Sequence, residues 1–505
     1  MKGKRLWIAL AIIGMMGVGT LVTGALAYFS DTENSTGSSP TVWTSTQWTQ
    51  TSKTDFDAGV LTGVNTSFSS GNVILQPGYS TTTADLFLFW DGAGAVPTGW
   101  TDVSVSGQAF YQRFPRGAAT WATGGAATHS HTIGLVSVGP PSATTDHLSG
   151  GTNRSSSTHT NHGISGSTAT ASSLPSYRNL RVIRATNVPA IIPAGAIAIF
   201  DTTPPTGWTR YSAQDNYFIR GEAVGVVGTT GGSNTHNHTF SRTITASTEY
   251  QAVSTATPRI ATAATGHTHT ISGTTPDADT RPPYLTVILA KADNDTAIPY
   301  GMIGMFNATP TGAWSVLSDT GGPFDSVFLV GGSSYGATGG ASTHNHADAI
   351  VTSSDSSSTT NACTTTPNVS VAANGHNHSV TLSFGTPANT LPPYRNTIFA
   401  KAIYPTSGTV ASPVLDTTVT GSRWDALFWD ETLQANTDIT FAVRARDTSF
   451  LMTAATPTWT AVVGNSPFLS GLPAGTYKQW RATLTTTDTA NTPTLSEVRL
   501  YYYGP

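Results

Sequence analysis

Twelve of the thirteen histidines in this 505-residue chain form six close pairs that recur at a fixed period. Five pairs are H-x-H and one is H-T-N-H; they are His129/His131, His159/His162, His236/His238, His267/His269, His344/His346 and His376/His378. Random placement of thirteen histidines gives about 0.3 H-x-H triplets, from (13/505)² × 503. Leading pairs recur after 107 and 108 residues, and a second pair follows each about 30 residues later. The sequence therefore predicts three tandem repeats with two histidine pairs each.

The H-x-H spacing indicates metal binding. In an extended strand, residues i and i+2 project from the same face, so the pair directs two imidazoles toward one point. Two nitrogens hold a metal ion weakly, but three pairs around a threefold axis supply six nitrogens in an octahedral set. Imidazole suits Fe, Zn, Ni and Co; we expect a divalent transition metal, Fe or Zn first, with Ni or Co as alternatives. A filled ligand set leaves no position for substrate, which predicts a structural role. The competing interpretation is exposed histidines on polar loops.

Two architectures fit this arithmetic. The three repeats can fold around a pseudo-threefold axis within one chain, making two sites with six histidines each. One site would use His129, His131, His236, His238, His344 and His346, and the other would use the remaining six paired histidines. Alternatively, three chains run side by side with six stacked sites. The short linkers between repeats, 186–190 and 293–298, favour the single-chain pseudo-trimer.

Composition predicts an all-β fold. Hydrophobic residues make up 38% of the chain and there are 12 Trp, which is too much apolar content for a disordered protein. Short β-branched and aromatic runs alternate with Gly, Pro, Ser and Asn, and long amphipathic helical patterns are missing. The net charge of −4, without a basic stripe, argues against nucleic-acid binding.

The N-terminus predicts export. Residues 1–27 combine a charged start, an apolar run and an A-x-A ending, the pattern of a signal peptide. If uncleaved, the apolar run would be the only membrane contact. We expect a secreted, extracellular or cell-surface protein. Cys363 is the single cysteine, so the chain has no intramolecular disulfide.

The stretch YFSDTE that follows at 28–33 resembles the mature N-terminus of exported biofilm-fibre and camelysin-like proteins. That resemblance implies that the extended segment 28–41 could donate a strand to a neighbouring molecule.

The three repeats share more than histidines. Each opens with an apolar strand and a turn that ends at Trp100, Trp208 or Trp314. An aromatic segment follows (FPRG, FIRG, FLVG), then a Gly-rich stretch into the first histidine pair. Each repeat closes on a Pro-Tyr strand: LPSYRNLRVIRA, RPPYLTVILAKA or LPPYRNTIFAKA. The predicted repeats span 80–190, 191–295 and 296–405.

These elements together resemble the collar region of phage short tail fibres, and the H-x-H pairs look like those of long-tail-fibre tips. In those trimeric proteins, H-x-H pairs from three chains coordinate metal ions on the fibre axis. The resemblance implies that all twelve paired histidines are ligands. Three copies in one chain depart from the family, and the i, i+3 spacing of His159 and His162 makes that pair the least secure. His147 has no partner and is expected to be polar surface.

The last segment, 406–505, predicts a β-sandwich with alternating strands and three tryptophans. It resembles jelly-roll modules of secreted surface proteins. Residues 42–79 look like the strand pair that precedes such a module, so we expect them to pack with it. Asp425, Asp430 and Glu431 beside Trp424 and Trp429 fit either a glycan or Ca²⁺ site or, more simply, a core with solvated acids.

These features favour an exported, non-enzymatic fibre or adhesion protein. Its partners would be other copies of itself, as a filament or trimer, or a surface glycan or protein ligand. Binding is expected at the variable loops 132–158, 239–266 and 347–375. One alternative is a filament subunit assembled by donor-strand exchange. The other is a metal-dependent enzyme, which would need an open ligand position. The chain has no phosphate-binding loop, no H-E-x-x-H and no G-x-S-x-G motif.

Overall fold

The computed structural model describes residues 45–67, 71–79, 85–141, 145–146, 154–155, 164–186, 191–244, 269–354, 378–384, 387–464 and 471–504. Within these ranges nearly all the regular secondary structure is β-strand, with a single α-helix, α1 (Lys53–Asp57). Two turns of 3-10 helix, η1 (Ser212–Gln214) and η2 (Val224–Val226), complete the helical content of the same ranges. The predicted all-β class is confirmed.

The predicted export segments, residues 1–27 and 28–41, lie outside the described residues. Among the helices that the structure does describe, none has the length and apolar character needed to cross a membrane.

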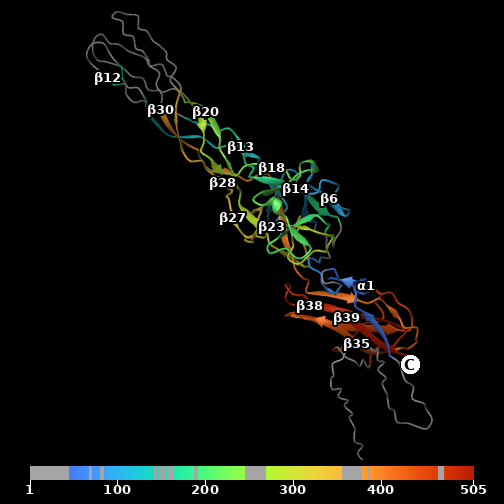
Figure 1. Cartoon of the computed structure of the whole chain (residues 1–505). Coiled ribbons are helices and arrows are strands. Elements are labelled where there is room, and N and C mark those ends of the chain that lie inside the picture. The colour runs from blue at the N-terminus through green and yellow to red at the C-terminus, as the bar shows by residue number, and fades with distance from the viewer. Residues whose placement is uncertain are drawn as a thin grey trace, which may run out of the picture. The chain divides into compact units, whose positions relative to one another are not determined.

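The chain divides into two compact units (Figure 1). Unit 1 comprises Met1–Ile74, Gly408–Thr485 and Pro493–Pro505. Unit 2 comprises Leu75–Ser407 and Thr486–Thr492. In sequence, the long segment of unit 2 is therefore inserted into unit 1.

Unit 1 contains two sheets. The first has the order β1 (Thr46–Gln50), β39 (Thr494–Tyr503), β35 (Arg423–Thr432). The second has the order β2 (Val60–Thr62), β33 (Ser407–Ala411), β38 (Tyr477–Thr486), β36 (Thr437–Arg446), β37 (Thr460–Val462), and β34 (Leu415–Asp416) also pairs with β38. Trp429 on β35 stacks on Phe441 on β36 with ring centroids 4.2 Å apart, so the two sheets face each other across an aromatic core. Strands from 46–62 thus pair with strands of the C-terminal module.

Unit 2 contains the three repeats, and each supplies the same five strands to one 15-stranded sheet. The shortest strand of each repeat is β8 (Thr123–Gly124), β18 (Thr230–Gly231) or β27 (Thr338–Gly339). The opening strands are β5 (Leu86–Trp90), β15 (Ala196–Phe200) and β24 (Ile303–Phe306). The tryptophan strands are β6 (Trp100–Asp102), β16 (Trp208–Arg210) and β25 (Trp314–Val316). The aromatic strands are β7 (Phe114–Gly117), β17 (Phe218–Gly221) and β26 (Phe328–Gly331). The closing strands are β14 (Tyr177–Ala185), β23 (Tyr284–Ala292) and β32 (Tyr394–Ala402).

The strand pairings close into a ring. The closing strand of repeat 1 pairs in parallel with the aromatic strand of repeat 2, that of repeat 2 with repeat 3, and that of repeat 3 with repeat 1. The opening strands β5, β15 and β24 pair with one another in the same cyclic manner. Because every repeat makes the same contacts with the next, unit 2 has a pseudo-threefold arrangement within one chain.

The apolar opening strands are buried on both faces, which explains their continuous hydrophobic sequences LFLFW and AIAIF. Alternate residues enter two separate clusters: Leu86 and Leu88 pack with the tryptophan strands, while Phe87 and Phe89 pack in the other cluster. A third cluster gathers one phenylalanine from each aromatic strand, Phe114, Phe218 and Phe328. The core therefore takes equivalent residues from all three repeats.

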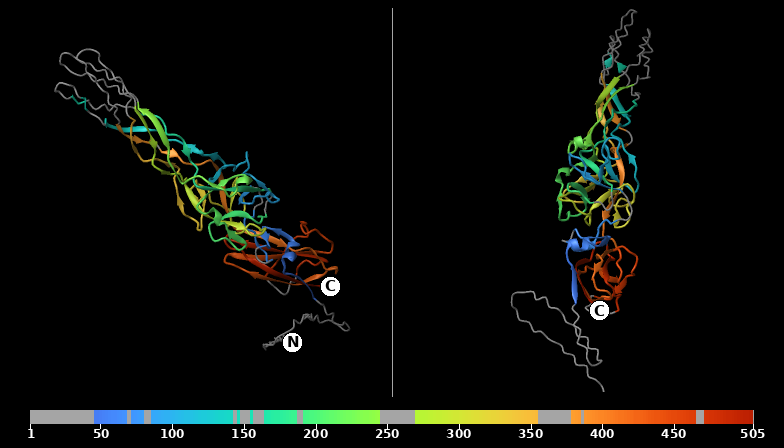
Figure 2. Two further views of the ribbon diagram at one scale, coloured as in Figure 1. Left: turned by 45° about the horizontal axis from the view of Figure 1, so that its top comes forward. Right: turned by 90° about the vertical axis from the view of Figure 1, so that its right-hand side faces the viewer.

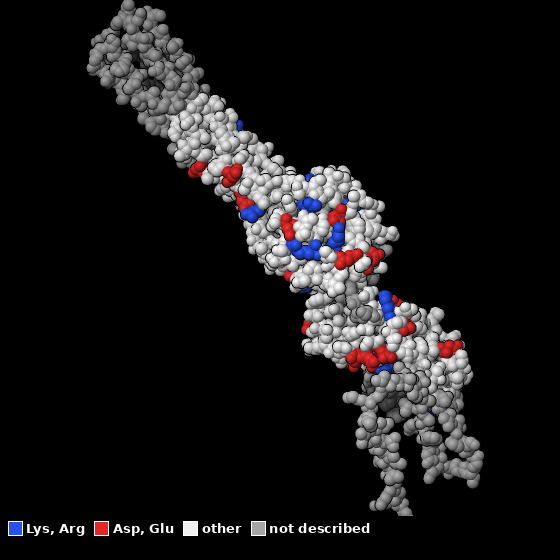
Figure 3. All heavy atoms as spheres, in the orientation of Figure 1, with Lys and Arg blue, Asp and Glu red and all other residues white. Residues whose placement is uncertain are grey.

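Ion pairs also join successive repeats. Lys291 of repeat 2 contacts Asp91 of repeat 1 at 2.7 Å, and Lys401 of repeat 3 contacts Asp201 of repeat 2 at 2.8 Å. Figure 3 shows charged side chains gathered over the broad part of unit 2, which contains the large sheet. Few lie on the narrow part, which contains a two-stranded and a three-stranded antiparallel ladder.

The narrow part of unit 2 is an extension of short antiparallel ladders (Figure 2). β20 (Thr239–Ile244) pairs with β21 (His269–Thr274), and β30 (His378–Ser383) lies between β10 (Gly134–Pro141) and β29 (Ala349–Thr352). Since β10 belongs to repeat 1 and β30 to repeat 3, the repeats also interlock here. An apolar cluster lies inside the extension, formed by Ile133, Phe240, Ile271, Val380, Leu382 and Phe384. In sequence, the leading histidine pairs precede the outgoing strands β10, β20 and β29, whereas His269 and His378 begin the returning strands β21 and β30.

Candidate metal centre

The leading histidine pairs occupy the same register in all three repeats. The short strands β9 (Thr128–His129), β19 (Thr235–His236) and β28 (Thr343–His344) each pair with a strand of their own repeat, namely β13 (Ala171–Ser172), β22 (Ala278–Asp279) and β31 (Ala388–Asn389). His129, His236 and His344 lie opposite Ala171, Ala278 and Ala388 respectively. The small alanine side chains leave room beside each imidazole. Equivalent registers then place equivalent rings around the pseudo-threefold axis.

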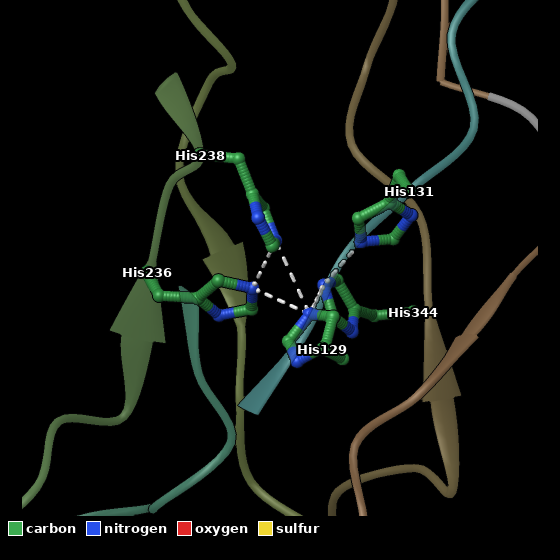
Figure 4. A group of neighbouring side chains, drawn as sticks. All are labelled: His129, His131, His236, His238 and His344. Atoms are coloured by element: carbon green, nitrogen blue, oxygen red, sulfur yellow. Dashed lines mark hydrogen bonds between the residues drawn. The ribbon is translucent and has the colours of Figure 1, made fainter. Parts of the chain in front are cut away.

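Figure 4 draws five of the six leading histidines, whose Nε2 atoms converge on one point. Ligand atoms of His129, His131, His236, His238 and His344 all lie within 4.8 Å of one another. Nε2 of His129 is 3.0 Å from that of His236 and 3.3 Å from that of His344. Nε2 of His346, the sixth, is 3.2 Å from that of His344. The structure thus brings together the six residues that the sequence assigns to one site.

The six rings are arranged as an octahedron. Each ring lies edge-to-face against its neighbours, with centroids 4.6–5.3 Å apart, and each has one opposite ring that it does not contact. The opposite pairs are His129/His346, His131/His236 and His238/His344. For a regular octahedron, dividing the 3.0–3.3 Å edges by √2 puts the centre about 2.1–2.3 Å from the nitrogens, at or slightly above the roughly 2.0–2.1 Å of zinc–imidazole bonds. A six-coordinate transition-metal ion fits this donor set.

Hydrogen bonds at Nδ1 orient two of the three inner rings, which belong to the second histidine of each leading pair. Nδ1 of His238 donates to the carbonyl oxygen of Ala169 at 2.7 Å, and Nδ1 of His346 donates to that of Pro276 at 2.6 Å. A carbonyl oxygen can only accept, so each Nδ1 carries the proton and the Nε2 lone pair faces the centre. Each of these bonds crosses from one repeat to another.

A hydroxyl group holds two of the three outer rings, which belong to the first histidine of each leading pair. Nδ1 of His129 is 2.9 Å from the Ser173 hydroxyl, and Nδ1 of His236 is 2.5 Å from the Thr280 hydroxyl. The equivalent residue of repeat 3, Thr390, donates its hydroxyl to the carbonyl of Ala341 instead. Nδ1 of His344 is buried with no hydrogen-bond partner. The centre is therefore not fully symmetric.

Burial keeps the imidazoles neutral. Desolvation, followed by the proximity of the other rings, lowers the pKa of His129 and His344 from 6.5 to about 3. The same causes lower the pKa of His131 and His236 to about 4. Desolvation also lowers the pKa of His238 and His346. Neutral imidazole is the form that binds metal.

Of the second set of histidines, the structure describes His269 and His378. Both are buried, and their rings lie edge-to-face with centroids 4.9 Å apart. Nδ1 of His269 donates to the carbonyl oxygen of Ser354 at 2.9 Å, the same type of bond that orients His238 and His346. His159, His162, His267 and His376 lie outside the described residues, as does the unpaired His147.

Sequence reasoning missed the residues that hold the inner histidines. The backbone N–H of His131 donates to the Thr168 hydroxyl, and that of His238 donates to the Thr275 hydroxyl, both at 3.0 Å. Both pairs are 37 residues apart, and the Ser173 and Thr280 anchors both follow their histidines by 44 residues. These constant offsets could have been found by aligning the repeats beyond the histidines. At the second set, the Ser353 hydroxyl accepts from the N–H of His378 in the same way.

The acidic residues of unit 1 show a simple structural arrangement. Trp424 and Trp429 are buried, and the Trp429 indole N–H donates to Glu431 at 2.9 Å. Asp430 contacts Arg499 at 3.0 Å. This geometry matches the simpler of the two sequence interpretations, core tryptophans with acids at the surface. Cys363 lies outside the described residues.

Comparison with protein-family models, with curated proteins and with solved structures finds no match to this chain.

Proposed function

We propose that the protein is an exported, non-enzymatic fibre or adhesion protein of the cell surface or extracellular space. A divalent transition-metal ion, bound by the six leading histidines, cross-links its three repeats. In this role the metal holds together a narrow extension that has a small apolar core. The partners we propose are a surface glycan or protein ligand, or further copies of the chain.

One observation carries this proposal, the convergence of six Nε2 atoms on one point. Because Nδ1 of His238 and of His346 donates to a carbonyl, the Nε2 atoms of these two rings present lone pairs to the centre. The neighbouring Nε2 atoms crowd the same point at 3.0–3.3 Å, where more lone pairs would repel. A cation at the centre converts that repulsion into six favourable bonds. The arrangement is therefore best explained as a metal site.

The ligand set favours a structural ion. Six protein nitrogens fill an octahedron and leave no position for substrate or water, which distinguishes such a site from an open catalytic one. Six-coordination favours Fe, Ni or Co, and Zn would have to depart from its usual four ligands. We propose Fe or Zn first, with Ni or Co as alternatives, and a second site of the same kind that includes His269 and His378.

The first test is metal content and solution mass measured together, by elemental analysis of protein purified without a histidine tag and by light scattering. We expect a monomer with one metal ion per chain from the six described histidines, and two if the second site is also filled. A metal-free chain that is nevertheless fully stable would overturn the proposal. A trimeric mass would instead assign the sites to interfaces between chains.

A further inference from the structure

The six-histidine cage has one face that differs from the others. His129, His131 and His344 are mutual neighbours and so define one triangular face of the octahedron. The Nε2 atom of His344 lies 3.3 Å from that of His129 and 3.2 Å from that of His131. His344 is also the outer ring whose Nδ1 has no hydroxyl anchor, because Thr390 is bonded to Ala341. Nδ1 of His131 is also buried with no hydrogen-bond partner among the described residues, so two of the three ligands of this face lack a bond at Nδ1.

The same face adjoins a cavity. A space of about 560 Å³ is lined by residues 125–126 and 128–132 of repeat 1, which include His129 and His131, and by Pro387, Ala388, Asn389 and Leu391 of repeat 3. Its volume far exceeds the roughly 30 Å³ that one water molecule takes up in the liquid. The cavity is therefore large enough to hold a hydrated metal ion beside His129 and His131.

The equivalent wall of repeat 2 is more firmly held. The positions that correspond to Pro387 and Asn389 are Asp277 and Asp279, since Ala278 and Ala388 have the same register. Asp277 accepts a hydrogen bond from Asn237 at 3.0 Å, and Asp279 pairs with Arg281 at 2.7 Å. In repeat 3, the Asn389 side chain accepts a bond from the Leu391 backbone N–H, as Asp279 does from that of Arg281. Pro387, however, has no polar side-chain group to match the bond between Asp277 and Asn237. Repeat 3 thus provides the looser wall.

We infer that the metal ion enters and leaves the cage through the cavity between repeats 1 and 3, across the face formed by His129, His131 and His344. His344 and His131 are the last ligands to bind and the first to dissociate, because their rings can turn without breaking a hydrogen bond at Nδ1. The other two outer rings would each have to break a bond to Ser173 or Thr280. This inference rests on the proposed metal centre and adds a route for exchange.

The test is the rate at which metal-loaded full-length protein loses its ion to an excess of chelator. Ala126→Trp places an indole in the cavity, and the matched control Ala341→Trp adds the same side chain at the equivalent position of repeat 3, three residues before the leading histidine. We expect Ala126→Trp to slow both release and reloading at least tenfold at unchanged metal affinity, and Ala341→Trp to have a much smaller effect. Blocking the path slows release and reloading by the same factor, so the metal affinity does not change. Damage to the histidine site would change the metal affinity.

A second pair of variants tests the role of His344. Thr280→Val removes the anchor of His236 and should speed release several-fold, while Thr390→Val should leave the rate unchanged because its hydroxyl does not hold His344. Equal effects of the two tryptophan variants, or a large effect of Thr390→Val, would overturn the route. A wild-type chain that binds no metal would overturn the metal centre itself, which separates the two failures.

Discussion

Two histidines of this centre, His238 and His346, are held at Nδ1 by a carbonyl of another repeat. His238 directs Nε2 to the shared centre and donates from Nδ1 to the Ala169 carbonyl of repeat 1. The bond at Nδ1 selects the tautomer that can bind metal. The hydrogen bond at Nδ1 therefore both orients the ring of His238 and leaves its Nε2 lone pair directed at the centre.

Replacing this residue should affect both properties. His238→Ala leaves the Ala169 carbonyl without its partner and removes one of six ligands, so we expect unit 2 to lose about 2–4 kcal/mol of unfolding free energy and metal content to fall. Denaturant unfolding with elemental analysis measures both. His147→Ala is the matched control, since His147 belongs to no pair. Equal stability of the two variants would contradict the structural role.

Acid should destabilise the metal-free protein. The folded-state pKa values of His129 and His344 are lowered to about 3, below the usual 6.5 of an unfolded chain. Between these values the unfolded chain binds more protons, so this contribution to stability is complete above pH 6.5 and declines as the pH falls toward 3. Urea unfolding of chelator-treated protein at pH 7.5 and pH 5 measures the loss. The double variant His236→Ala/His238→Ala should show a shallower dependence, and an equally steep one would assign the effect to other groups.

At this scale, the sequence predicted that the leading histidines come together but not which groups support them. The H-x-H spacing alone implies two rings on one face of a strand, which is information contained in neighbouring residues. The partners at Nδ1 are carbonyl oxygens of Ala169 and Pro276, and a carbonyl exists at every position. Residue identity therefore could not reveal them.

At the scale of elements, the ring depends on parallel pairing between a closing strand and the next aromatic strand. Tyr177 on β14 lies opposite Phe218 on β17, and Tyr394 on β32 lies opposite Phe114 on β7. The phenylalanines meet at the common cluster, where Phe114 and Phe328 have ring centroids 6.5 Å apart. Apolar packing in this cluster therefore joins the three repeats at a place separate from the histidine site.

Removing one phenylalanine should weaken the whole ring. Phe328 is fully buried, and Phe328→Ala should cost about 3–5 kcal/mol of unfolding free energy, because a cavity opens where three repeats meet. Thermal unfolding followed by calorimetry checks this in unit 2. Phe428→Ala, at a half-buried position of unit 1, serves as the control and should leave the unit 2 transition in place. A loss below 1 kcal/mol for Phe328→Ala would show that the repeats are held elsewhere.

The sequence indicated the strands but not their partners. Apolar runs between Pro and Gly marked the opening and closing strands, since local composition determines where a strand can form. Which strand pairs with which depends on residues more than 30 positions apart, as in Tyr394 with Phe114. No charge pattern in those segments specifies the cyclic order.

At the scale of the whole molecule, one chain supplies every ligand of the described centre. Metal binding should therefore not depend on protein concentration, unlike binding at an interface between chains. Chelation should lower the melting temperature of unit 2, because metal at 1,000 times its Kd adds about 4 kcal/mol to the unfolding free energy. The melting temperature should be the same at protein concentrations that differ about 100-fold. Calorimetry with and without chelator measures this. The His236→Ala/His238→Ala variant should not respond to chelator, and a concentration-dependent melting temperature would point to an intermolecular site.

Covalent linkage of the three repeats has a further consequence. In a ring of three identical chains, any substitution appears at all three positions at once. Here each position is encoded separately, and the repeats already differ: Arg116 and Arg220 each lie over a tyrosine ring, whereas repeat 3 has Val330 at that position. The strand ladders of the extension likewise differ between repeats. One molecule can thus combine a shared scaffold with three independently variable faces, and a ligand that approaches it meets a surface with a defined rotational orientation.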